Sequence, residues 1–428
     1  MASGLSEHPT NGSRTRDALT LFTLMIAAEA IYFLPFVIAR IFRPTMLDIF
    51  AITNFELGLA FSAYGVVAML AYFPGGPLAD LFAPKKLMVI ALLSTAVGGL
   101  VMSTIPGLPK LRVLYAYWGL TTVLLFWAAM IRAVRQLGGK HYSGSAFGLL
   151  DGGRGLVAAA SASIAVMIYA SLLPADVESA TMSERSQAFE KMILVFAAAT
   201  AAASVLVWFV IPNQGPAEDS ERPTVTLFGG FTVLKLPAVW LQSIIIVCAY
   251  VAYKGLDDVS LYAKVALDFD EVNAAYSGTV SMWVRPFAAV AAGLIADRTR
   301  VSRMTAASFL VLAIGSGVIA SGILQAGMIV GFFMVIVGTS AAVHALRGLY
   351  FAIMQEGEIP LEYTGTVVGI VSTVGYTPDI FMGPLMGKLL DDSPGILGHQ
   401  HVFAVIAAFS MVGCAAAMVF QRFVKLRH

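Results

Sequence analysis

The feature that most constrains this chain is a series of about twelve apolar stretches, each long enough to cross a lipid bilayer as a helix. A spanning helix needs roughly 20 mostly apolar residues. Strands of a membrane barrel alternate in polarity over about 10 residues, whereas these runs are longer and apolar on all faces. The sequence therefore predicts an all-α membrane protein. The predicted spans are 18–41, 56–78, 87–104, 112–134, 146–172, 190–211, 238–262, 273–295, 304–322, 327–351, 365–388 and 402–421.

The composition agrees with this class and excludes several others. Hydrophobic residues make up 58% of the 428 positions and charged residues only 12%. A soluble protein has about 45–50% apolar and about 25% charged residues, so this chain has too little polar material to cover a surface that faces water. The net charge of +1 gives no bulk attraction to nucleic acid. Cys248 and Cys414 have no metal or redox spacing, and we expect no cofactor.

The distribution of Lys and Arg predicts that both termini lie in the cytoplasm. Residues 1–17 are polar and no cleavage-site pattern follows the first apolar run, so this run is kept as the first span. We expect the protein in the inner (plasma) membrane of a bacterium. The predicted cytoplasmic side carries Arg14, Arg16, Lys85, Lys86, Arg135, Lys140, Arg222, Lys235, Arg298, Arg300, Arg303, Arg422, Lys425 and Arg427. The predicted outer side carries Arg43, Lys110, Arg112, Arg185, Lys191 and Lys264.

A polar insert divides the chain into two halves of six spans, and the halves resemble each other. The predicted segments are a tail (1–17), the first half (18–212), a cytoplasmic loop (213–237), the second half (238–421) and a short tail (422–428). Three pairs of segments match in the same order: GPLAD at 76–80 with GLIAD at 293–297, IRAVR at 131–135 with VHALR at 343–347, and YSGS at 142–145 with YTGT at 363–366. Duplicated six-helix halves are a known transporter architecture.

With these features the sequence resembles the major facilitator superfamily over essentially its whole length. The loop motif of that family reads roughly Gly-x-x-x-Asp-x-x-Gly-Arg-Arg/Lys. This chain has Gly76 and Asp80, but Ala83 and Pro84 replace the second Gly and the first Arg before Lys85. The second copy contains Gly293, Asp297, Arg298, Arg300 and Arg303. The resemblance implies alternating access, a monomer, and a cavity surrounded by helices 1, 4, 7 and 10 with parts of 2, 5, 8 and 11.

A glycine pattern in the fifth span resembles a second motif of the family. Gly144, Gly148, Gly152 and Gly153 follow the family's antiporter pattern, but Leu149 stands where proline is expected. Small residues at this spacing mainly permit close helix packing. The pattern is therefore only weak support for export.

Charges that occur in both halves are candidates for the gating machinery. Asp80 matches Asp297 and Arg135 matches Arg347, all near the predicted cytoplasmic ends. An aspartate there can meet the positive end of a helix and a nearby arginine, and the resemblance implies that this arrangement latches the inner gate. The alternative is interfacial anchoring by snorkelling side chains.

Charges that occur in one half only are better candidates for binding an asymmetric molecule. Placing an ionised side chain at the bilayer centre costs about 2.5–3.5 kcal/mol on insertion scales. We therefore expect that a charge inside a span has a function. The alternative is mutual pairing that only locks helices together. The candidate substrate-binding residues are Arg154, Arg285, Tyr32 and Arg132, and the candidate proton-coupling residues are Glu29, Asp379 and His344. On the seventh span we expect a local ion pair of Lys254 with Asp258 or Asp257, and Tyr250 and Tyr253 either line the cavity or pack.

Two arginines and two carboxylates inside the spans favour uptake of a small organic anion, such as a carboxylate, together with protons. Arginine suits bidentate recognition of a planar carboxylate, and a buried carboxylate can carry the proton. The alternatives are proton-driven export of a cationic or amphipathic compound, with Glu29 and Asp379 attracting the cation, and uptake of a neutral sugar. The spans are poor in Asn and Gln, which disfavours the sugar.

Non-transporter classes have no support in the motifs. The chain has no His-Glu-x-x-His, no Walker loop and no Gly-x-Ser-x-Gly, so an intramembrane enzyme is not expected. A membrane sensor would need a sizeable soluble signalling domain, and the sequence contains no such segment. The expected partners are the lipid bilayer, a small-molecule substrate and the proton as coupling ion.

Overall fold

The structure, a computed structural model, describes residues 11–213, 234–324, 327–350, 352–357 and 364–425. These residues form helices and short connections, with no strand among them. The first half contains α1 (Asn11–Ala30), η1 (Phe33–Val37), α2 (Ile38–Ile41), α3 (Arg43–Phe50), α4 (Asn54–Leu81), α5 (Pro84–Ser103), α6 (Leu108–Gly119), η2 (Leu120–Trp127), α7 (Ala128–Leu172), η3 (Val177–Ser179) and α8 (Met182–Val210). The second half contains α10 (Pro237–Gly255), η5 (Leu256–Asp258), α11 (Val259–Leu267), α12 (Glu271–Arg298), α13 (Val301–Ala320), α14 (Ile329–Leu349), η6 (Ala352–Gln355), α15 (Thr364–Gly375), α16 (Pro378–Asp392) and α17 (Ile396–Lys425).

The spans follow the predicted series closely. Within the described residues, ten helices are long and apolar enough to cross a membrane, and the bent pair of 16–30 with 33–41 brings the number to eleven. The predicted span 365–388 is divided into α15 and α16, which are each too short to be counted. Large apolar side chains such as Phe209 (79% exposed) and Val330 (73% exposed) cover the outer face, as expected where lipid is the solvent. The predicted fold class is confirmed.

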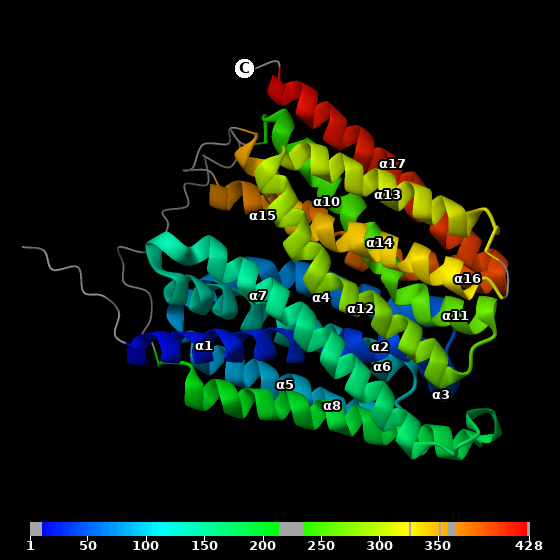
Figure 1. Ribbon diagram of the computed structural model, residues 1–428. Coiled ribbons are helices and arrows are strands. Elements are labelled where there is room, and N and C mark those ends of the chain that lie inside the picture. Colours follow the sequence, from blue (N-terminus) through cyan, green and yellow to red (C-terminus); the bar gives the residue numbers. More distant parts are fainter. Residues whose placement is uncertain (1–10, 214–233, 325–326, 351, 358–363, 426–428) are drawn as a thin grey trace, which may run out of the picture.

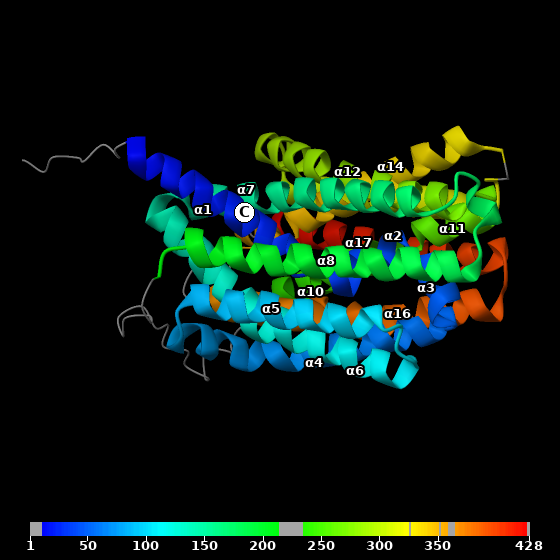
Figure 2. The same ribbon diagram turned by 90° about the horizontal axis from the view of Figure 1, so that it is seen from below.

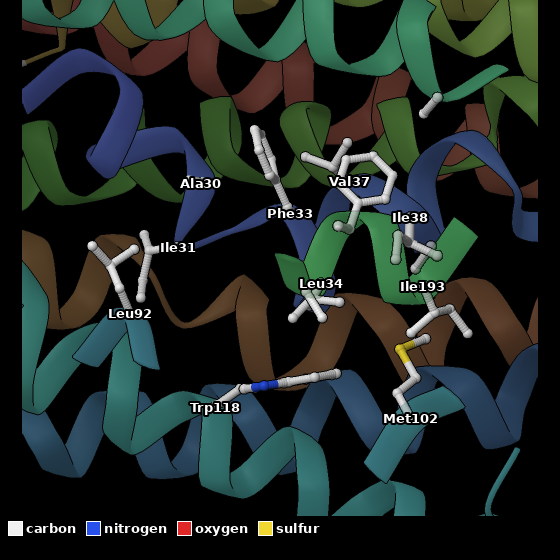
Figure 3. Close-up of a cluster of buried hydrophobic side chains, with 14 of the residues drawn as sticks. Ala30, Ile31, Phe33, Leu34, Val37, Ile38, Leu92, Met102, Trp118 and Ile193 are labelled. Carbon is white, nitrogen blue, oxygen red and sulfur yellow. The ribbon is translucent and has the colours of Figure 1, made fainter. Parts of the chain in front are cut away.

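The helices form two bundles that lie side by side, one from each half of the chain (Figure 1, Figure 2). Each half has its own large cluster of buried hydrophobic residues. In the first half, Leu34 points toward Trp118 of a surrounding helix, and Leu92 and Ile193 belong to the same cluster (Figure 3). We call the end of the molecule where α1 begins and α17 ends the terminal end, and the opposite end the distal end.

The two halves contact each other most closely at the distal end. The start of α4 packs against the end of α16 with almost no space between the backbones. A Cβ atom added to Gly58 would lie 2.3 Å from the carbonyl oxygen of Gly383, and one added to Gly387 would lie 2.3 Å from the carbonyl oxygen of Asn54. Glycine is required here because backbone atoms cannot move aside as a flexible side chain can.

Three spans are interrupted near their middle. The first span bends by 43° between α1 and η1, where Pro35 cannot donate a backbone hydrogen bond. The seventh span changes from α10 through the 3₁₀ turn η5 to α11, and the eleventh breaks between Gly375 and Pro378. Interrupted helices free backbone groups and side chains at membrane depth, and in transporters they border binding sites.

The close contact between α4 and α16 gives a testable expectation. Gly58→Ala should destabilise the closed distal end by about 1–3 kcal/mol, the usual range for overpacking, and should lower the Tm of the purified protein. Gly369→Ala is the matched control, because a Cβ atom at Gly369 on α15 meets nothing within 4 Å. Equal Tm values for the two variants would show that the close approach of α4 and α16 is not needed.

Candidate functional site

A cavity lies between the two halves at the level of the interrupted spans. Its empty volume is about 1000 Å³, part of which is open solvent, at the upper end of the range for small-molecule sites. The charged residues that line it are Glu29, Arg40, Arg154, Lys254, Arg285, Arg347 and Asp379. The aromatic residues that line it are Tyr32, Phe36, Tyr64, Tyr72, Trp127, Tyr250, Tyr253 and Tyr376. Residues from both halves therefore build one polar and aromatic site.

One cluster of charges joins the halves through Glu29 of α1. Arg154 Nε of α7 donates to Glu29 Oε2 at 3.2 Å, and Arg285 Nη1 of α12 lies 3.4 Å from the same oxygen. Arg285 Nη2 also donates to Asp151 Oδ1 at 3.1 Å. The Glu29, Arg154 and Arg285 side chains are at most 10% exposed. Both arginines are thus neutralised by carboxylates of the first half.

A second cluster surrounds Lys254 at the end of α10. Lys254 Nζ lies 3.0 Å from Asp379 Oδ1, and the Tyr250 hydroxyl donates to Asp379 Oδ2 at 3.0 Å. Lys254 is also 3.9 Å from Asp257, whose main partner is Arg40 Nε of the first half at 2.5 Å. The expected local contact of Lys254 is therefore formed with Asp257 but is secondary, because Asp379 of another span lies closer.

Arg347 differs from the other basic residues of the cavity because no carboxylate of the described chain pairs with it. Its guanidinium carbon lies 4.0 Å from the centre of the Tyr253 ring, in a cation–π contact. Its Nη1 atom is enclosed and has no hydrogen-bond partner. An enclosed donor without an acceptor costs free energy, so this guanidinium can still accept a further hydrogen-bond partner.

The distal side of the cavity is closed by a polar network centred on Glu271, the first residue of α12. Its side chain is 3% exposed and lies 2.8 Å from Arg185 Nη1 of the first half. The Tyr169 hydroxyl donates to Glu271 at 3.0 Å, and Lys264 Nζ is 3.5 Å away. The hydrogen bonds and ion pairs that join described residues of the two halves lie at the level of the cavity or on its distal side.

The structure brings many of the predicted site residues together. Glu29, Tyr32, Arg154, Arg285, Asp379 and Arg347 all line the cavity. Among the residues described around it, Arg132 and His344 are not part of the lining. Arg132 Nη1 donates to the carbonyl oxygen of Ala79 at 2.6 Å, and His344 is buried against Tyr253. The side chains of Asp80, Arg135 and Asp297 lie outside the described part.

Sequence reasoning missed two basic residues of the cavity. Arg40 and Lys254 both line it, but Arg40 stands at the end of a predicted span and Lys254 has local carboxylates that explain it. The signal for Arg40 was available, because it is a charge inside an otherwise apolar run. Its partner Asp257 is more than 200 positions away, and the sequence does not reveal that pairing.

The Lys254–Asp379 pair predicts a measurable stability pattern. Asp379→Ala leaves Lys254, which is 3% exposed, without its main partner, and a broken buried pair typically costs about 3–5 kcal/mol. The double variant Lys254→Met/Asp379→Leu should recover most of the lost Tm, because it removes both charges. If the double variant is as unstable as the sum of the two single changes, the side chains are not energetically coupled.

Comparison with known proteins agrees with this architecture. The family model described as Major Facilitator Superfamily matches residues 22–381. Inner membrane protein YqcE of Escherichia coli strain K12 is 25% identical over 89% of this chain and 90% of its own length. Inner membrane protein YihN of the same organism is 23% identical over 96% of this chain and 97% of its own.

Solved structures share the fold. Nucleoside transporter NupG superposes with a TM-score of 0.70 at 12% identity and covers 96% of this chain and 99% of its own. A bacterial homologue of the human lysosomal transporter Spinster, inward-facing and unoccupied, gives a TM-score of 0.72 at 12% identity, with 97% and 98% covered. At such identities the likeness shows the fold alone. Since the family model spans most of the sequence, the chain belongs to the Major Facilitator Superfamily and is an integral membrane transporter, not an enzyme.

Proposed function

We propose that this transporter carries a small organic anion of the carboxylate type by alternating access, in symport with protons. The proposal depends on one observation about Arg347. This residue lines the cavity, its Nη1 donor is enclosed, and no carboxylate of the described chain pairs with it. Arginine presents a planar fork that matches a carboxylate bidentately. Arg347 was expected in a gate, but its place in the cavity lining supports a role as substrate ligand.

The charge balance of the cavity supports an anion. Five basic residues line it: Arg40, Arg154, Lys254, Arg285 and Arg347. The carboxylates that pair with them are Glu29, Asp151, Asp257 and Asp379, one fewer than the basic groups. A monoanionic substrate would balance the set. A cationic substrate would have to displace an arginine or lysine from its carboxylate, and a neutral sugar would leave Arg347 uncompensated.

Asp379 offers a simple route to proton coupling. It accepts from Lys254 and from Tyr250 inside the cavity. When Asp379 binds a proton, it loses the negative charge that neutralises Lys254. The Lys254 ammonium group, like the Arg347 guanidinium, is then available to bind the anionic substrate. Proton and anion then favour each other's binding, which is the thermodynamic requirement for symport. Glu29 and His344 remain further candidates for the same role.

The closed distal network suggests which state of the cycle the structure represents. We take residues 18–212 and 238–421 as the two moving bodies and the terminal end as cytoplasmic, because Lys and Arg collect there. The inner membrane is the expected location, as for the two Escherichia coli relatives. The cavity then faces inward, with Asp80, Asp297 and Arg135 as candidates for closing the inner side in the other state. We propose that the transporter works as a monomer.

Substrate class and site can be tested together by thermal shift. The purified protein is heated with gluconate, lactate, benzoate, glucose, adenosine or tetraphenylphosphonium. A ligand at about 100 times its Kd should stabilise the fold by about 2.7 kcal/mol. Arg347→Gln should weaken binding of the active carboxylate about 10- to 100-fold, because one charged hydrogen-bonding group is lost.

Two controls separate binding from general damage. Arg298→Gln changes an exposed arginine at the end of α12 and should leave the shift intact. Arg347→Lys keeps the charge but not the fork, so it should recover only part of the affinity. Stabilisation by adenosine, glucose or tetraphenylphosphonium alone, unchanged in Arg347→Gln, would contradict the anion proposal.

A further inference from the structure

The first turn of α4 is completed by a carboxylate from the other half of the chain. Asp391, near the end of α16, accepts from the backbone N–H of Asn54 at 3.1 Å and from that of Phe55 at 2.8 Å. It also accepts from the side-chain amide of Asn54 at 3.2 Å. Because α4 belongs to the first half and α16 to the second, these three hydrogen bonds join the two bodies directly.

The sequence at the start of α4 explains why these two N–H groups take a partner from elsewhere. The first N–H groups of a helix have no acceptor within the helix itself. The Thr53 hydroxyl accepts from the backbone N–H of Glu56 at 3.2 Å, and the Glu56 carboxylate accepts from the backbone N–H of Thr53 at 2.9 Å. This capping box does not use the N–H groups of Asn54 and Phe55. They are the two that Asp391 accepts from.

Electrostatics favour a carboxylate at this position for two reasons. The N-terminus of a helix carries a partial positive charge, which stabilises an anion beside it. In addition, Arg43 is 2% exposed, and its Nε and Nη2 atoms donate to Asn54 Oδ1 at 3.2 Å and 3.0 Å. The Asn54 side chain therefore links a buried cation of the first half to the Asp391 carboxylate of the second half.

The next residue of α16 shows that this contact is specific to Asp391. The Asp392 side chain is 62% exposed and pairs with Lys388 of the same helix at 3.2 Å. Gly387, one turn before Asp391, lets the backbones of α16 and α4 approach closely, because an added Cβ atom would lie 2.3 Å from the Asn54 carbonyl oxygen. Of the two adjacent carboxylates, Asp391 therefore contacts the other half and Asp392 contacts its own helix.

We propose that Asp391 is the latch of the distal end, a gating residue that holds α4 against α16 while this end is closed. The proposal rests on the alternating access proposed above and names a residue that must let go when the distal end opens. Separation of α4 from α16 breaks all three hydrogen bonds, because their donors and acceptor belong to opposite halves. Water can then replace each lost partner, so the latch is reversible.

The distance between the halves at the distal end tests the latch without any substrate. Lys110 of the first half and Ser321 of the second are exposed at this end. Spin labels on Lys110→Cys and Ser321→Cys, in the full chain with Cys248→Ala and Cys414→Ala, report the separation by double electron–electron resonance. A distal-closed molecule gives the shorter distance and a distal-open molecule the longer one.

The latch variants are compared in a background that already weakens the closed end. Gly58→Ala overpacks α4 against α16, which brings the open state into the measurable range. In this background Asp391→Ala should raise the ratio of open to closed molecules about tenfold, because hydrogen bonds to a charged group are lost. Asp391→Asn keeps an acceptor oxygen without the charge and should give an intermediate ratio.

The matched control is the neighbouring carboxylate. Asp392→Ala removes an exposed side chain that pairs within α16, so it should leave the ratio as it is in Gly58→Ala alone. Equal ratios in the Asp391→Ala and Asp392→Ala variants would overturn the latch.

A wedge separates failure of the latch from failure of alternating access. Gly58→Trp places a large side chain where the Gly383 backbone lies and should force the distal end open. If the wedge lengthens the distance but Asp391→Ala does not raise the open fraction, the latch is wrong and alternating access stands. If the wedge leaves the distance unchanged, the distal end does not open between α4 and α16, and both proposals fail. The anion proposal is decided by the thermal shifts in either case.

Discussion

The structure depends on one constraint, which is that charges at membrane depth must be compensated. Glu29 is shared by Arg154 and Arg285, and Asp257 pairs with Arg40. Two of these ion pairs, Glu29–Arg285 and Arg40–Asp257, join opposite halves. The pairs that lower the free-energy cost of burying each charge therefore also hold the two halves together. A transporter that moves its halves must exchange these partners rather than simply lose them. In the proposed symport, substrate and proton are the mobile charges that would take part in that exchange.

The interrupted spans place those charges. Tyr32 lies at the bend of the first span, Asp257 and Asp258 on the 3₁₀ turn of the seventh, and Tyr376 at the break of the eleventh. A continuous helix would present each side chain at a fixed angular step. On a 3₁₀ turn, which has three residues per turn, successive side chains lie about 120° apart, so neighbours face different partners. Asp257 therefore reaches Arg40 in the other half, while Asp258 reaches His399 in its own half.

Among the described residues, the close contacts between the halves lie at the distal end, whereas the side chains of Asp80, Arg135 and Asp297 at the terminal end are outside the described part. At the distal end, glycine positions on α4 and α16 permit direct backbone contact, and Glu271 collects donors from both halves. Tight packing and buried hydrogen bonds make this end cooperative, because few of these contacts can be lost without the others. The distal contacts would therefore have to open together in the proposed cycle.

Much of the fold was determined by the sequence alone. Apolar runs of membrane length fix the spans because lipid offers no partner for backbone polar groups, and the matching segments at 76–80 and 293–297 predict two related halves. The charges inside those runs also identified Glu29, Arg154, Arg285 and Asp379, which the structure gathers in one cavity.

Only the tertiary structure decided which charges pair and which one is left without a partner. Lys254 has Asp257 and Asp258 as sequence neighbours, yet it lies closest to Asp379, and His399 takes Asp258. In the sequence, Arg347 matches Arg135 of the first half. In the structure it lines the cavity against the Tyr253 ring, and no carboxylate of the described chain pairs with it. The reason is physical: pairing depends on how each helix is rotated and where it breaks, and these are set by packing between segments more than 100 positions apart.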